Sequence, residues 1–111
     1  MFGKQLVIEW RPVESPIDKA RCEAAKLQHA FVYTIREKIK TIPPHPVTGV
    51  KRNSILGYCR NVNIPYDRFA RVISGRVILR LEDIAVAKLV LGNLYEEAIE
   101  NYEKMALPLN E

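Results

Sequence analysis

The stretch TIPPHPVTGVKRN, residues 41–53, constrains the fold of this chain more than any other part of its sequence. Prolines occupy three of the four positions after Ile42, and proline lacks the backbone N–H that a helix interior requires. Helical patterns lie on both sides of it. We therefore predict a proline-rich linker at 43–53, which separates a unit of residues 1–42 from a unit of residues 54–107.

The N-terminal unit combines a strand pattern with a long helical pattern. Residues 4–10, KQLVIEW, are rich in β-branched and aromatic side chains and predict a short strand. Ser15 and Pro16 suit the cap and the first position of a helix. Apolar residues then recur at three- and four-residue steps over 15–42, at Ala20, Ala24, Leu27, Phe31, Ile35, Ile39 and Ile42. A helix of about six turns in so small a protein is a candidate dimerisation arm.

The C-terminal unit reads as four further helices. Helical patterns with start and stop residues cover 54–62, 65–74, 81–91 and 93–107. Between the second and third of these, residues 76–81 have an extended pattern, and 76–80 is expected to pair with 5–10 as a small sheet. The predicted fold class is therefore mainly α, a five-helix helix-turn-helix domain with a small N-terminal strand pairing near 76–80.

The first two helices of this unit have the spacing of a helix-turn-helix. Each is about nine residues long, and a three-residue turn around Asn63 joins them. Such a pair needs a small residue midway along the first helix, an apolar residue after the turn, and apolar residues inside the angle between the helices. These are supplied by Cys59, Ile64, Phe69, Val72 and Ile73.

With those residues buried, the opposite face of the second helix of the pair shows Tyr66, Asp67, Arg68 and Arg71. We expect both arginines to project outward, where an arginine can bond O6 and N7 of guanine in the major groove. Simpler interpretations stand beside this one. Asp67 and Arg71 are four residues apart and could form a surface ion pair. The other side chains could serve as a turn contact at Tyr66, a solubilising charge at Arg68 or a cover for apolar surface at Arg60.

Charge is distributed unevenly along the chain. Residues 51–80 contain seven basic residues and one acidic residue, a net charge of +6, whereas residues 81–111 contain two basic and seven acidic residues, a net charge of −5. A basic middle segment beside an acidic C-terminal segment indicates a protein with two different surfaces. One surface would bind a polyanion, and the other would not.

Residues 54–91 resemble the Cro/C1-type helix-turn-helix domains, also called lambda-repressor-like or XRE-like. The matching features are the small residue at Cys59, the turn at Asn63, the helix start at Ile64-Pro65, the apolar Phe69 and Val72, Gly75-Arg76 after the reading helix, and the following helix LEDIAVAKLVLG. Two positions depart from the family. Ile55 stands where many members have a phosphate-bracing glutamine, and Asn63 replaces the usual glycine.

The resemblance implies binding of double-stranded DNA. Carried over by position, it implies base-reading roles for Tyr66, Asp67, Arg68 and Arg71. The positions implied to contact phosphates are Lys51, Arg52, Ser54, Arg60 and Arg76. The family also joins the preceding helix to the motif by a short turn, so residues 1–50 are not explained by the resemblance.

The function predicted from these observations is sequence-specific DNA binding by a small transcriptional regulator, a repressor that acts as a homodimer on two half-sites. The alternative is an antitoxin-like or adaptor protein whose main partner is another protein. In that case the acidic C-terminal helix, with Tyr95 and Tyr102 near its apolar stripe, would be the docking surface.

Enzymatic chemistry is not expected. The sequence has no Ser/His/Asp set and no glycine-rich phosphate loop, and the adjacent Glu82 and Asp83 suit the positive end of a helix dipole. We expect no cofactor or metal, since His29 and His45 have no ligand set nearby. Cys22 and Cys59 are expected to be reduced core residues of a cytoplasmic protein, and no apolar stretch is long enough to predict a membrane span.

Overall fold

The structure, a computed structural model, describes residues 15–106, and its regular secondary structure in that range is helical. It contains five helices and, within that range, no strand. Their bounds are α1 Pro16–Lys40, α2 Ile55–Val62, α3 Tyr66–Ile73, α4 Leu81–Leu91 and α5 Leu94–Ala106. The predicted class, mainly α with five helices, is confirmed.

The predicted strand near 76–80 is wrong. These residues form an irregular connection between α3 and α4. The backbone N–H groups of Arg76 and Val77 both donate to the carbonyl oxygen of Arg71, at 2.9 and 3.3 Å. These two donors therefore close the C-terminal end of α3, where an orphan carbonyl needs a partner. The strand predicted for residues 4–10 lies outside the described residues.

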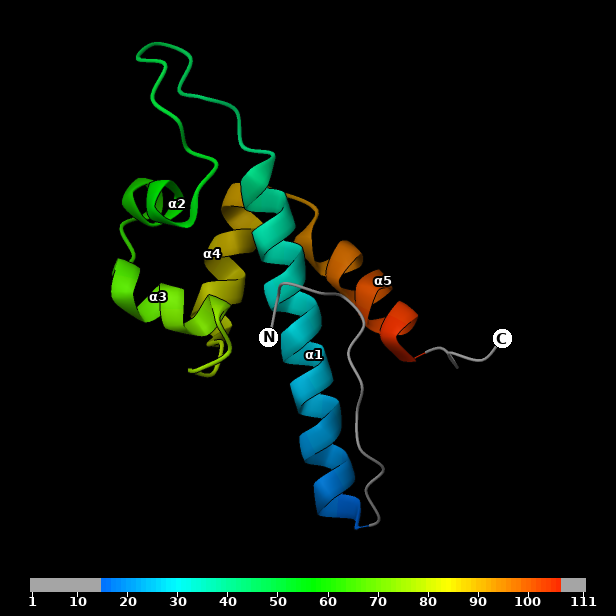
Figure 1. Cartoon of the computed structure of the whole chain (residues 1–111). Helices are drawn as coiled ribbons and strands as arrows, with labels where there is room; N and C mark the ends of the chain where they lie inside the picture. Colours follow the sequence, from blue (N-terminus) through cyan, green and yellow to red (C-terminus); the bar gives the residue numbers. More distant parts are fainter. Residues whose placement is uncertain (1–14, 107–111) are drawn as a thin grey trace.

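Helix α1 runs through the middle of the fold, with α5 on one side and α2, α3 and α4 on the other (Figure 1). It begins where predicted, because the Ser15 hydroxyl accepts a hydrogen bond from the Asp18 N–H at 3.0 Å. Its buried residues all lie in its second half: His29, Ala30, Val32, Thr34, Ile35 and Ile39.

The first turns of α1 extend beyond the other helices (Figure 1). Ala20, Ala24 and Leu27, which belong to the apolar stripe predicted for this helix, are exposed, although Tyr102 of α5 contacts the neighbouring Glu23. Cys22 is half-exposed rather than buried, and it is a free thiol like the buried Cys59. The apolar stripe of α1 therefore packs against the core from Phe31 onward, and its first part is exposed.

The second half of α1 belongs to the same core as the C-terminal helices. The buried cluster unites side chains of all five helices: Val32, Ile35, Ile39, Tyr58, Cys59, Phe69, Val72, Ile73, Ala87 and Leu94. Two polar interactions also connect α1 with α5. The Asn101 amide donates to the Thr34 hydroxyl at 2.8 Å, and Lys38 forms an ion pair with Glu97. The role of residues 1–42 as a dimerisation arm stays a prediction.

The linker folds back on itself between α1 and α2. The guanidinium of Arg52 donates from Nε to the Pro43 carbonyl and from Nη2 to the Pro44 carbonyl, at 3.1 and 3.3 Å. His45 organises the tip, because its Nδ1 accepts from the N–H groups of Val47 and Thr48. The chain then passes closely over the start of α2, where a Cβ on Gly57 would lie 3.1 Å from the Arg52 Cα.

Candidate nucleic-acid interface

Helices α2 and α3 have the local structure of a helix-turn-helix. Ser54 caps α2 by accepting a hydrogen bond from the Gly57 N–H at 3.0 Å. Asn63 ends α2 in the left-handed conformation, at φ 59° and ψ 47°. The Ile64 N–H donates back to the Cys59 carbonyl at 2.9 Å, and Pro65 then starts α3. The turn predicted around Asn63 is confirmed.

We expect Asn63→Ala to lower the free energy of unfolding by roughly 1 kcal/mol, because alanine tolerates a left-handed backbone less well than asparagine does. Asn63→Gly is the matched control and should retain or raise stability, since glycine adopts this conformation freely. Urea denaturation followed by circular dichroism measures both. Equal stability of the two variants would contradict the left-handed turn.

The inward faces of α2 and α3 form the centre of the core. Cys59, Phe69, Val72 and Ile73 are buried as predicted, and Ile64 is half-buried. Tyr58 adds a ring that was not predicted there, with its centroid 5.4 Å from that of Phe69. Burial and the neighbouring Cys59 and Asp83 raise the pKa of Tyr58 to about 12. Among the described residues its hydroxyl has no hydrogen-bond partner.

Three of the four predicted base-reading residues of α3 are exposed. Tyr66, in the first turn, is 44% exposed, and Asp67 and Arg71 are exposed on the face opposite to Phe69. Within residues 15–106, Asp67 and Arg71 do not form the ion pair that was the simpler interpretation. The prediction that Arg71 projects outward is confirmed, and its guanidinium is available to a ligand.

Arg68 differs from that prediction. Its guanidinium donates from Nη1 and Nη2 to the two carboxylate oxygens of Asp83, at 3.1 and 2.6 Å. Asp83 is only 2% exposed, whereas the Arg68 side chain is 26% exposed, so the pair holds the Arg68 guanidinium against the domain at the edge of the surface. The prediction that Arg68 projects outward is therefore wrong for its guanidinium, and its base-reading role stays a prediction. Arg68 lies four residues before the buried Val72 and therefore at the border of the apolar face of α3. This position in the sequence could have indicated that Arg68 would contact the rest of the domain.

Asp83 joins α3 to the start of α4. Besides the two bonds from Arg68, its Oδ2 accepts the backbone N–H of Arg80 at 3.0 Å. Burial alone would raise the pKa of this carboxyl, but the bonds and charges of Arg68 and Arg80 outweigh burial and lower the pKa from its usual value of 3.8. The predicted dipole role at the helix start thus accounts for only part of what Asp83 does.

The predicted phosphate-contacting residues divide into two groups. Lys51, Arg60 and Arg76 are exposed. Arg52 is half-buried and bonded to the linker carbonyls, and the Ser54 hydroxyl caps α2. Three exposed basic side chains therefore flank the helix pair along the chain, one before α2, one in the last turn of α2 and one after α3.

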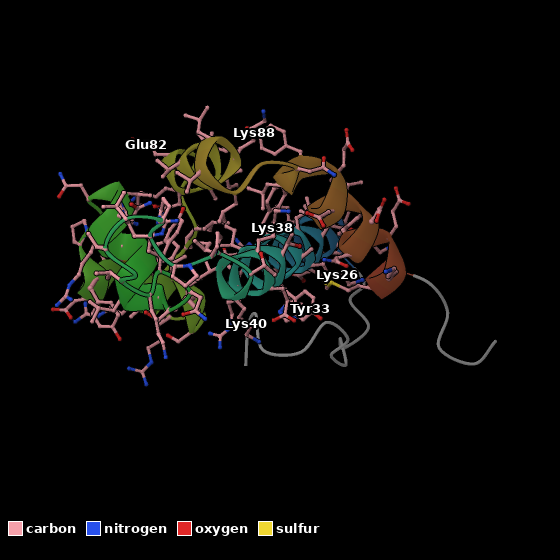
Figure 2. All side chains as sticks on the ribbon, turned by 90° about the horizontal axis from the view of Figure 1, so that it is seen from above. Lys26, Tyr33, Lys38, Lys40, Glu82 and Lys88 are labelled. Carbon is pink, nitrogen blue, oxygen red and sulfur yellow. The ribbon has the colours of Figure 1, made fainter. Side chains whose placement is uncertain are left out.

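The acidic helix α5 lies on the opposite side of α1 from α2 and α3 (Figure 2). Side chains around α2 and α3 end mostly in nitrogen, whereas oxygen-tipped side chains project from α5. Tyr95 of α5 is 47% exposed, and the Tyr102 hydroxyl donates to Glu23 of α1. The uneven charge of the sequence thus becomes a basic side and an acidic side.

Comparisons with family models, with curated proteins and with solved structures give no match to this chain. None of the helices described is both long enough and apolar enough to cross a membrane. Within the described range, no three histidine, cysteine or carboxylate side chains are grouped so that they could hold a metal ion.

Proposed function

We propose that this protein binds double-stranded DNA sequence-specifically, with α3 in the major groove. The observation that carries the proposal is the exposure of Tyr66, Asp67 and Arg71 on α3, together with exposed basic residues in the segments before and after it. An arginine can bond the O6 and N7 atoms of guanine, and a carboxylate can accept the N4 amino group of cytosine. The basic side chains supply the contacts to phosphates that hold the helix in register.

A regulatory role as a repressor fits this activity. Occupying an operator requires no chemistry, and a single helix-turn-helix reads only a few base pairs. We therefore propose a homodimer that places two α3 helices about one turn of DNA apart. The exposed first half of α1, whose first turns extend beyond the other described helices, supports its assignment as the dimerisation element (Figure 1).

The experiment is a selection from a random duplex library, followed by fluorescence-anisotropy titration of the enriched duplex. We expect Arg71→Ala to weaken binding by about 10- to 100-fold, as a bidentate base contact is worth roughly 1–3 kcal/mol. Lys104→Ala removes one exposed positive charge from α5 and is the matched control, expected to bind within about twofold of the native protein.

Enrichment of no sequence, or equal losses in the two variants, would contradict the proposal. Capture of a defined protein through α5, undisturbed by Arg71→Ala, would instead favour the antitoxin-like or adaptor alternative. The exposed Tyr95 is the residue whose replacement would then weaken the interaction.

A further inference from the structure

Helix α3 is short, and little besides its apolar face holds it in place. It spans eight residues, and Phe69, Val72 and Ile73 are its buried residues. Its N-cap, Pro65, makes no side-chain hydrogen bond to the first turn. Apolar contacts are non-directional, so they resist separation of α3 from the core more strongly than rotation of α3 about its own axis.

The Arg68–Asp83 pair supplies the directional contact. Two parallel N–H···O bonds between a guanidinium and a carboxylate fix the planes of both groups. The carboxylate is itself held at the first turn of α4 by the Arg80 N–H, at 3.0 Å. The pair therefore connects α3 to a fixed point on a second helix, through a side chain on the border of its buried face.

We propose that Asp83 is a positioning residue for DNA recognition, which holds α3 through Arg68 in the rotation that presents Asp67 and Arg71 to the major groove. The inference rests on the proposed function. Arg68 itself touches no base in this account, although it occupies a position that the family resemblance assigns to base reading.

The geometry of a helix makes this rotation matter. Successive residues are about 100° apart around the axis, so Asp67 and Arg71 lie within about 40° of each other on the outward face. A bidentate base contact requires a guanidinium within hydrogen-bond distance of two acceptors at once. A modest rotation of α3 would carry the side chain of Arg71 out of that range while leaving the apolar face buried.

The opposite assignment, in which Arg68 contacts DNA directly, predicts a result of opposite sign. If Asp83 merely competes with DNA for Arg68, then Asp83→Asn releases a positive charge and strengthens binding. If Asp83 positions α3, the same variant weakens binding although it removes a negative charge from a DNA-binding protein. Electrostatics alone cannot produce that weakening.

The test is a double-mutant cycle of Asp83→Asn, Arg68→Gln and the double variant, titrated against the duplex enriched from the random library at several salt concentrations. We expect each single variant to lose about tenfold in affinity and the double variant to lose no more than either. The slope of log K against log salt should stay at the native value, because no phosphate contact is removed.

Additive losses, tighter binding by Asp83→Asn, or a salt slope made shallower by about 0.9 in Arg68→Gln would overturn the inference. Should an unpaired buried charge unfold these variants, Arg68→Lys keeps the charge but cannot form the planar pair, and the same loss at an unchanged slope is expected. Arg71→Ala separates the two hypotheses. If it loses affinity while Asp83→Asn does not, DNA binding stands and the positioning role fails.

Discussion

Phe69→Ala is expected to lower the free energy of unfolding by about 3–5 kcal/mol. Phe69 is fully buried between the two helices of the motif, and its ring lies against that of Tyr58. Truncation removes the apolar contact and leaves a cavity that α2 and α3 cannot close without moving. Because a small domain has only about 5–15 kcal/mol of stability, urea denaturation should show a large shift of the midpoint.

The control for this variant is Tyr58→Phe in the same cluster. It retains the ring and removes only a hydroxyl that is buried without a hydrogen-bond partner among the described residues. We expect its stability to be unchanged or higher, since an unsatisfied buried polar group is itself destabilising. A loss of less than about 1 kcal/mol in Phe69→Ala would show that this ring is not central to the core.

Replacing Lys51, Arg60 and Arg76 together with glutamine is expected to weaken DNA binding by roughly two to three orders of magnitude per protomer at 0.1 M salt. Each phosphate contact contributes about 0.9 to the slope of log K against log salt, so the slope should become shallower by about 2.7 for each protomer. Anisotropy titrations of the enriched duplex over a range of salt concentrations measure both quantities.

A matched control removes positive charges elsewhere. Lys88 and Lys104 are exposed, and they lie on α4 and on α5. Their replacement by glutamine should leave the slope close to the native value, because charges beyond a Debye length of about 10 Å contribute little. If the control loses as much slope per charge removed as the triple variant does, binding follows net charge and not the surface of α2 and α3.

The helices were predictable because their ends carry explicit signals. Ser15 and Ser54 cap α1 and α2 as the sequence indicated, and Asn63 adopts the left-handed conformation at the turn. Within the motif the inward positions also followed, since Phe69 and Val72 lie one turn apart on an eight-residue helix with a strongly one-sided pattern. Sequence signals within a few residues were therefore enough to predict the helix ends and the inward residues of α3, because these features depend on neighbouring residues in the chain.

The first half of α1 shows what periodicity leaves open. A three- and four-residue repeat states which residues share a face, but not whether another helix of the same chain covers that face. Leu27 belongs to the same repeat as Ile35, yet Leu27 is exposed and Ile35 is buried. The packing of the other helices around α1 decides this difference, and that packing is not a local property.

The contact between Arg68 and Asp83 could not be predicted from local sequence patterns. Arg68 and Asp83 are 15 positions apart, in different helices, and each has an ordinary surface interpretation on its own. Only the angle between α3 and α4 brings the two charges together. Asp67 and Arg71 were predictable as outward residues because they lie on the side of α3 opposite to Phe69.

The central claim is that the surface built on α2 and α3 contacts DNA. Its most direct test is a titration of the isotope-labelled protein with the enriched duplex, followed by amide chemical shifts. We expect the largest changes at α3, at the end of α2 around Arg60 and at the connection around Arg76, while α5 changes little. Changes centred on α5, or spread evenly over the domain, would contradict it.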